Sequence, residues 1–283
     1  MNIHDDLSHS SENMTGSKSQ PLHNLWRSDF ALSEFKILDV YLSRINLHDP
    51  SKRTLQISKK ELESILNVTK IPIPELRKRL NHLQTSLVAL EEPSDNKFDN
   101  IVLFERARCE KENGQYIVTL TCSESAMDYI FNVENLGYLK YKLKVVIAIR
   151  SRYSYILFLY LEKNRFKKNR ILEIRVDELR SMMGCADDHS YDDFKYFNRL
   201  LKNAQKEICE NTPCQFTYET IREDRKVSKI RFKLKPLAKV YQNDPKIIEA
   251  GNSQKFKREN CQSLDCVEQP DKISSPQLEV NLF

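Results

Sequence analysis

The 283-residue chain has only five glycines, and each of them is isolated in the sequence. Isolated glycines form neither the phosphate-binding pattern G-x-x-x-x-G-K-[ST] nor the dinucleotide-binding pattern G-x-G-x-x-G. The longest apolar run, Tyr155 to Leu161, is far too short to cross a bilayer. The first residues lack the positive and apolar regions of a secretory signal. The sequence therefore argues against a nucleotide-driven motor or a Rossmann enzyme, and it predicts a cytoplasmic protein without membrane contacts.

The seven cysteines are odd in number and scattered along the chain. Cysteines of a cytoplasmic protein are expected to stay reduced. Cys209 and Cys214 are separated by four residues, as are Cys261 and Cys266, and this is the wide end of the spacing found in zinc fingers. The second pair also lies in a polar tail. We therefore expect ordinary thiols, with no metal and no cofactor.

Positive charge is concentrated in one part of the chain. Residues 140–235 carry 23 basic and 13 acidic side chains, a net charge of +10, whereas residues 22–139 carry 15 and 17, a net charge of −2. The formal net charge of the whole chain is only +5. A local excess of this size is typical of a protein that binds a polyanion, with nucleic acid the first candidate. A solvated surface rich in lysine and arginine is the alternative.

Two segments resemble each other at a constant offset of 117 residues. Segments 54–66 (TLQISKKELESIL) and 171–183 (ILEIRVDELRSMM) share Leu and Ile at their second and fourth positions, and both contain E-L-x-S. Each reads as a short strand followed by a helix, with Ser58 and Asp177 as the expected N-caps. An apolar helix precedes each segment, and a second helix and a β-hairpin follow it. The first hairpin has the turn sequence Asn113-Gly114, which is typical of a type I′ turn.

The order helix, strand, helix, helix, hairpin is that of a winged helix, a helix-turn-helix with an added β-wing, and here it occurs twice. We therefore predict an α+β fold with two tandem winged-helix domains and disordered termini. The expected divisions are a disordered leader at 1–21, a first domain at 22–139, a second domain at 140–236 and a flexible tail at 237–283. The second domain should be the main sequence-specific DNA-binding domain. The first should provide dimerisation and auxiliary DNA contacts.

The helix expected from about Tyr191 to Glu210 has two different faces. Its apolar residues recur at spacings of three and four and should form one buried stripe, made of Phe194, Phe197, Leu201, Ala204 and Ile208. A second face carries side chains suited to phosphates and to base edges in the major groove: Lys195, Asn198, Arg199, Lys202, Asn203 and Lys206. A helix that is merely solvated would alternate acids with bases, but the acids here lie near its ends. The pattern predicts a recognition helix for double-stranded DNA.

The hairpin that follows is predicted to be a basic wing. Its second strand turns Ile230, Phe232 and Leu234 inward, and the tip is rich in cations. We expect contacts with the DNA backbone from Arg222, Arg225, Lys226 and Lys229. Lysines on an edge strand also prevent aggregation, so the strand residues are weaker evidence for DNA contact than the tip residues.

The corresponding helix of the first half should make fewer DNA contacts, because its domain is slightly acidic. The expected core stripe is Leu76, Leu80, Leu83 and Leu87. The expected DNA contacts are Lys70, Arg77, Lys78 and Asn81, with His82 as a surface or phosphate-contacting residue. The remaining surface of this domain is free to pair with another protomer.

Several runs in the second half resemble the iteron-binding family of plasmid replication initiators: SYILFLYL (154–161), EIRVDELR (173–180), FKYFNRLLKNAQKEI (194–208) and RKVSKIRF (225–232). The resemblance is strong over 150–236, looser over 22–135 and absent from both termini. It implies that monomers bind direct repeats at an origin, and that dimers bind an inverted repeat in the protein's own promoter and repress it. It also implies recruitment of a host initiator and a replicative helicase. The recognition role then falls on Lys195, Asn198, Arg199 and Lys202.

Catalysis is not expected. Some plasmid initiators nick DNA with a tyrosine and a metal held by a His-hydrophobe-His pair, but no two of the six histidines here are separated by a single residue. Other nucleophile and metalloprotease motifs are missing as well. The expected mechanism is stoichiometric: several copies bind adjacent repeats and strain the duplex, which favours melting nearby. A winged-helix transcription regulator without an initiation role is the alternative. RNA binding is a third reading, but no aromatic RNP-type strand is visible.

Overall fold

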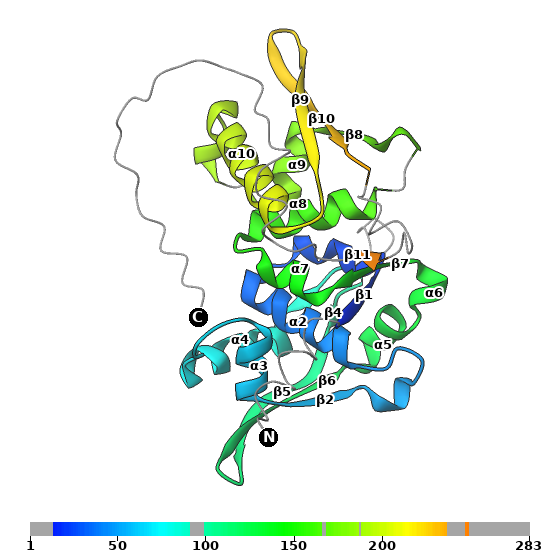
Figure 1. Cartoon of the computed structure of the whole chain (residues 1–283), viewed down its shortest axis with the longest axis vertical. Coiled ribbons are helices and arrows are strands. Elements are labelled where there is room, and N and C mark those ends of the chain that lie inside the picture. Colours follow the sequence, from blue (N-terminus) through cyan, green and yellow to red (C-terminus); the bar gives the residue numbers. More distant parts are fainter. Residues whose placement is uncertain (1–13, 91–98, 166–167, 187, 237–246, 249–283) are drawn as a thin grey trace.

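The computed structural model describes residues 14–90, 99–165, 168–186, 188–236 and 247–248. The two halves of the chain lie one after the other along the long axis of the molecule (Figure 1). Each half carries a β-hairpin, and the two hairpins project at opposite ends. This arrangement is the one expected for two winged helices in tandem.

The first half mixes short helices with short strands. Its elements up to residue 90 are β1 (Thr15–Ser19), η1 (Pro21–Arg27), α2 (Leu32–Arg44), η2 (Pro50–Lys52), β2 (Thr54–Ser58), α3 (Lys59–Ile65), α4 (Ile73–Thr85) and β3 (Leu87–Val88). From residue 99 onward come β4 (Ile101–Val102), β5 (Phe104–Glu112), β6 (Gln115–Cys122), α5 (Glu124–Phe131), α6 (Val133–Leu136), β7 (Tyr138–Lys142) and α7 (Leu143–Ala148).

The second half contains the longest helix among the described residues. Its elements are α8 (Arg152–Lys163), η3 (Lys168–Arg170), β8 (Ile171–Arg175), α9 (Val176–Met182), η4 (His189–Tyr191), α10 (Phe194–Asn211), β9 (Phe216–Glu223), β10 (Lys226–Leu234) and β11 (Ile247–Ile248). Helix α10 is the predicted recognition helix, and it begins three residues later than the sequence pattern indicated.

Both halves have the same strand topology, in the orders β2-β6-β5 and β8-β10-β9. In each, the strand before the helix pair is antiparallel to the second strand of the hairpin. The bounds of β2 and α3 recur in β8 and α9 exactly 117 residues later, which confirms the internal repeat. At the first hairpin, Asn113 and Gly114 have φ angles of 47° and 84°, as a type I′ turn requires.

One of the two predicted N-caps is correct. The Ser58 hydroxyl accepts a hydrogen bond from the backbone N–H of Glu61, at 3.1 Å. Asp177 is not the cap of α9, because Arg175 occupies that position and no side chain caps this helix. The repeat places Arg175 where the first half has Ser58, and Asp177 instead forms an ion pair with Arg175 at 2.8 Å.

The expected domain divisions need correction at three places. Residues 15–19, assigned to a disordered leader, form β1, which pairs with β7 over five residues. The boundary expected after residue 139 cuts through β7, whose partner strand belongs to the first half. In the expected flexible tail, β11 pairs in parallel with β7.

The polar sequence of β1 gives no local strand signal, because its burial comes from a partner more than a hundred residues away. Residues 1–13 and most of the tail lie outside the described residues.

A buried ionic cluster joins the two halves. Asp39 on α2 is fully buried and forms an ion pair with Lys18 of β1, at 2.8 Å. Its two carboxylate oxygens also accept hydrogen bonds from the hydroxyls of Tyr141 and Tyr155, at 2.5 and 2.7 Å. Burial, together with the charge of Asp39, raises the pKa of both tyrosines, which therefore remain donors. Because Tyr155 lies on α8, the cluster ties the second half to the first.

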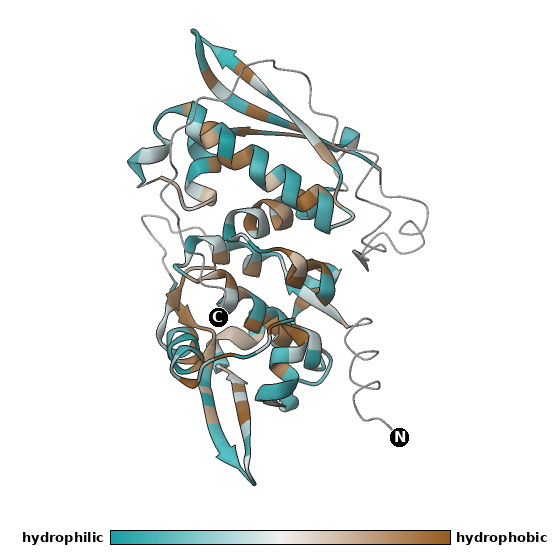
Figure 2. Ribbon diagram, turned by 60° about the vertical axis from the view of Figure 1, so that its left-hand side comes forward, coloured by the Kyte–Doolittle hydropathy of each residue, from teal (hydrophilic) through white to brown (hydrophobic). Residues whose placement is uncertain are grey.

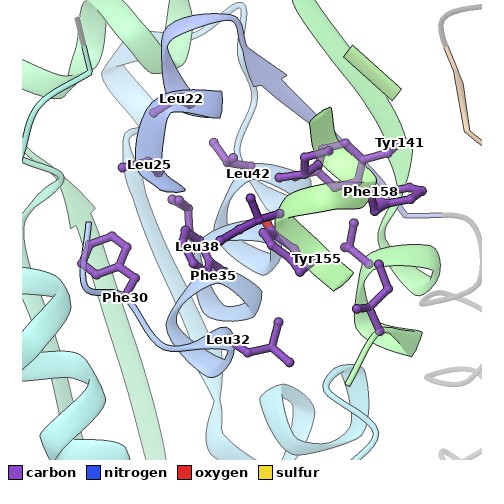
Figure 3. Packing of buried hydrophobic residues seen from close by; sticks show 14 of the residues in the cluster. Leu22, Leu25, Phe30, Leu32, Phe35, Leu38, Leu42, Tyr141, Tyr155 and Phe158 are labelled. Atoms are coloured by element: carbon purple, nitrogen blue, oxygen red, sulfur yellow. The ribbon is translucent and has the colours of Figure 1, made fainter. Parts of the chain in front are cut away.

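Two further contacts strengthen this junction. The ring of Tyr155 stacks on Phe35 of α2, with centroids 5.1 Å apart, and Figure 3 shows both rings within the apolar core. The guanidinium of Arg152, at the start of α8, donates hydrogen bonds to the backbone carbonyls of Ser28 and Phe30, both at 2.9 Å. Apolar packing and hydrogen bonds therefore both resist movement of α8 away from the first half.

Substitution of Asp39 by Ala should strongly destabilise the protein. The change leaves the Lys18 ammonium buried without its counter-ion and removes the acceptor of both tyrosine hydroxyls. Breaking a buried ion pair from one side costs about 3–5 kcal/mol, and a loss of that order is expected in the free energy of unfolding. Urea denaturation followed by circular dichroism measures it.

The matched control is Asp128→Ala, which removes an exposed carboxylate from α5. Its effect should stay within about 0.5 kcal/mol. A loss below about 1 kcal/mol for Asp39→Ala would show that the cluster does not hold the junction.

Candidate nucleic-acid interface

Helix α10 separates apolar and polar side chains onto different faces. Asp193 caps it by accepting a hydrogen bond from the backbone N–H of Lys195, at 2.8 Å. The stripe predicted to be buried is confirmed for Phe197, Leu201, Ala204 and Ile208, whereas Phe194 is half-buried. The residues exposed on the other side contain no acid: Lys195, Tyr196, Arg199, Lys202, Asn203 and Lys206.

The four cations of this face are available to a ligand. Among the described residues, no ion pair involves Lys195, Arg199, Lys202 or Lys206. Their positive charge is therefore not neutralised within the protein. A row of exposed cations on one helix attracts a polyanion and can contact successive phosphates.

On the strands of the second hairpin, unlike on α10, the cations form ion pairs with acids of the protein. Arg231 forms ion pairs with Glu173 and Glu219, at 2.6 and 2.8 Å, and Lys233 also pairs with Glu219, at 2.8 Å. Lys229, one of the predicted wing contacts, is half-buried and lies 3.3 Å from Glu223. The cations along the strands are therefore engaged with neighbouring acids.

The tip of the wing keeps its charge. Arg222, Arg225 and Lys226 are exposed, and no ion pair among the described residues involves them. Asp224 and Arg225 form the turn with φ angles of 49° and 69°. An open cleft separates this tip from the N-terminal ends of α9 and α10, and Lys195 lines its opposite wall. Unpaired cations therefore line both walls of the cleft, together with the acids Asp177, Asp192, Asp193 and Glu223.

Asn198 does not lie on the exposed face where the sequence pattern placed it. Its side chain is half-buried, and its Oδ1 atom accepts a hydrogen bond from the Tyr218 hydroxyl of β9, at 2.7 Å. Tyr196 was missed by the sequence pattern although its side chain is 53% exposed. The available signal was its position, three residues before Arg199 on the same side of the helix.

Helix α4 of the first half has a similar but less charged outer face. Lys70, which precedes the helix, and Arg77, Lys78 and Asn81 are all exposed, as predicted. Arg79 forms an ion pair with Glu75 at 2.7 Å. The core stripe is confirmed for Leu76, Leu80 and Leu83. Leu87 is an error in that stripe, because the helix ends at Thr85 and Leu87 lies in β3 with 66% of its surface exposed.

His82 is held by acids and is therefore not a free phosphate contact. Its ring nitrogens lie 2.9 Å from Glu34 and 3.2 Å from Asp29. Burial lowers the pKa of His82, but the hydrogen bonds and charges of Glu34 and Asp29 outweigh it and the net shift is upward. The imidazole thus links α4 to the N-terminal end of α2.

The two helices predicted to contact DNA, α4 and α10, lie on the same side of the molecule. In Figure 1, α4 and α10 are both on the left of the long axis, while the two hairpins point to opposite ends. In Figure 2, which brings that side forward, the ribbons of α10 and of both hairpins carry hydrophilic residues interspersed with hydrophobic ones. Both helices therefore lie toward one side of the long axis, between the two hairpins.

Two family models match this chain. Residues 18–162 match the model described as initiator replication protein, WH1, and residues 175–234 match initiator Rep protein, WH2. The chain belongs to the initiator replication protein family. The tandem winged-helix fold predicted from the sequence is thereby confirmed.

One solved structure agrees with this initiator fold. The crystal structure of Pi initiator protein in complex with iteron DNA matches with a TM-score of 0.65 at 20% sequence identity. The match covers 79% of this chain and 97% of that one. RctB domains 2-3 give a TM-score of 0.41 at 10% identity, over 76% of this chain and 82% of that one. No curated protein sequence is significantly similar to the chain.

Within the described part of the initiator, no helix is long and apolar enough to span a membrane. The same residues contain no group of three or more His, Cys, Asp or Glu side chains placed to hold a metal ion. Cys209 and Cys214 are buried cysteines that are not oxidised to disulfides, and burial raises the pKa of Cys214. Cys261 and Cys266 lie outside the described residues.

The Asn198→Ala variant should lose stability. The substitution leaves the partly buried Tyr218 hydroxyl without its acceptor, which costs about 1 kcal/mol of unfolding free energy. Asn203→Ala removes the same side chain from an exposed position of the same helix and should change stability by less than about 0.5 kcal/mol. Equal losses for the two variants in chemical denaturation would contradict the assigned contact.

Proposed function

We propose that this initiator binds double-stranded DNA at direct repeats of a plasmid origin, through one face formed by both winged helices. The observation that carries the proposal is the row of unneutralised cations on α10 beside the unneutralised wing tip. Membership of the initiator family supports it. The matching Pi initiator protein, crystallised in complex with iteron DNA, supports the choice of direct repeats.

The geometry favours a division of labour within the second domain. Arg199 lies near the centre of the exposed face of α10, where a guanidinium can form two hydrogen bonds with a guanine in the major groove. Lys195, Lys202 and Lys206 flank it and suit phosphates. Arg222, Arg225 and Lys226 at the wing tip contact the backbone beside this groove, with Lys229 contributing less because it is already paired.

The first domain plays an auxiliary role in this proposal. Lys70, Arg77, Lys78 and Asn81 present a second polar face on the same side as α10. Two recognition helices on one side suit successive major-groove segments of one duplex face, about one helical turn apart. The remaining surface of this domain pairs with a second copy, in a monomer–dimer equilibrium.

Initiation follows from binding and not from catalysis. Several copies on adjacent repeats deform the duplex, and the added protein–DNA contacts offset the cost of deformation at flexible steps. A neighbouring A·T-rich segment then opens, and a host initiator and replicative helicase are recruited. Dimers repress the initiator's own promoter at an inverted repeat. The whole process takes place in the cytoplasm.

A footprint on the DNA that flanks the protein's own gene tests this proposal. Purified full-length protein should protect several direct repeats in phase. Protection of a single inverted repeat in the promoter would instead support the alternative, a transcription regulator with no initiation role. Without sequence-dependent protection at any salt concentration, the DNA-binding proposal fails.

Arg199→Ala and Arg225→Ala should weaken binding in different ways. If Arg199 contacts a guanine, its loss costs about 1–3 kcal/mol on the specific site and much less on random DNA. Loss of Arg225 should weaken both DNAs alike and reduce the slope of log K against log salt by about one. Fluorescence anisotropy over a salt series measures both effects.

Arg231→Ala is the matched control, because Arg231 is a cation of the same domain that is already paired with two glutamates. Its effect on binding should be small. If each of the two variants, Arg199→Ala and Arg225→Ala, lost as much affinity for random DNA as for the specific site, the division of labour would be wrong.

A further inference from the structure

An exposed aromatic ring lies within the polar face of α10. Of the large hydrophobic side chains in the described part of the chain, only Leu87, Tyr116, Ile171 and Tyr196 are exposed, and Tyr196 at 53% is the one on α10. The other three lie on strands. A tyrosine left in water on a recognition helix forgoes the free energy that burial of its ring would contribute. Such exposure is explained if the ring is covered when the ligand binds.

The position of Tyr196 places it among the base-contacting candidates. It is the third residue of α10, in the N-terminal half that helix-turn-helix proteins use for base contacts. Arg199 follows at i+3 and Asn203 at i+7, so the three side chains lie on one side of the helix. Lys195 precedes it and lines the cleft toward the wing.

The hydrogen bonds on the exposed face of α10 do not involve the Tyr196 side chain. Among the described residues, no hydrogen bond engages its hydroxyl and no other ring stacks on it. Asn198, the nearest predicted base contact on the other side of the helix, is instead bound to Tyr218. The N-terminal half of α10 thus offers Lys195, Tyr196 and Arg199 to a ligand.

Thymine is the base with chemistry complementary to an exposed ring. In the major groove each base presents hydrogen-bonding atoms, but thymine alone adds an apolar group, its 5-methyl. We propose that Tyr196 is a specificity-determining residue that packs its ring against the 5-methyl of a thymine adjacent to the base contacted by Arg199. This inference rests on the proposed function, and it adds an apolar contact to an interface otherwise described by charge and hydrogen bonds.

The test removes the methyl group and the ring separately. Full-length protein first selects its preferred sites from a random library of double-stranded DNA. Each thymine of the selected site is then replaced by deoxyuridine, which lacks only the 5-methyl group. For the wild-type protein, one replacement should weaken binding about fourfold, the equivalent of one buried methyl-sized group at ~0.8 kcal/mol. In Tyr196→Ala the same replacement should have no effect.

Two further variants distinguish the role of the ring from other roles. Tyr196→Phe keeps the ring and should behave like wild type, including its sensitivity to deoxyuridine. Tyr116→Ala removes an exposed tyrosine from β6 of the first domain and should leave the deoxyuridine effect intact. A fourfold effect that persists in Tyr196→Ala overturns the inference. So does a loss in Tyr196→Phe equal to that in Tyr196→Ala, since the hydroxyl would then be the contact.

A measurement on the wild-type protein covers the case in which Tyr196→Ala does not fold. The sensitive thymine is replaced by 5-iododeoxyuridine, and the complex is irradiated. The crosslinked peptide should contain Tyr196, and a crosslink confined to other residues overturns the inference. If the library yields no preferred sequence at all, the proposed function fails first, which separates the two failures.

Discussion

The arrangement of both winged helices depends on one buried carboxylate. Asp39 holds Lys18 and the hydroxyls of Tyr141 and Tyr155 at the point where the first half meets α8. These groups come from four elements that are far apart in the sequence, and none of them is exposed to water. Because a buried charge tolerates little displacement from its partners, the cluster favours one relative orientation of the two halves. Arg152 adds hydrogen bonds to backbone carbonyls of the first half, which limits rotation of α8.

A common scaffold has acquired different surfaces in its two copies. The repeat gives both halves the same strand topology and equivalent helix pairs. On α4, Arg79 pairs with Glu75, and His82 contacts Glu34 and Asp29, so part of the basic character serves folding. On α10, the equivalent face keeps four cations without acidic partners. This contrast explains how one fold can supply an auxiliary contact in the first half and the main proposed DNA contact in the second.

Local patterns were sufficient to predict much of this structure. The spacing of apolar residues located α10 and its buried stripe, and Asn113-Gly114 located the first hairpin. The constant offset between segments 54–66 and 171–183 revealed the tandem architecture. Each of these signals depends on residues that are close in sequence, where periodicity and turn chemistry decide the outcome.

Long-range contacts account for the places where the structure differs from the predictions made from the sequence. Strand β1 has a polar sequence and is ordered only because β7 lies beside it. Asn198 has the residue type of a base contact, but Tyr218 on β9 holds its side chain. The predicted wing contact Lys229 is paired across the hairpin with Glu223. In each case the partner is distant or on another element, so no pattern along a single helix or strand could indicate it.

The distance between α4 and α10 in free and DNA-bound protein tests the central claim most directly. Spin labels attached at Thr85 and Asn211, exposed positions at the C-terminal ends of the two helices, would be measured by pulsed electron paramagnetic resonance. A fixed junction predicts one narrow distance distribution in the free protein that is unchanged when DNA is added. A broad distribution that narrows only on DNA would show that the ligand, and not the buried cluster, sets the arrangement of the two helices.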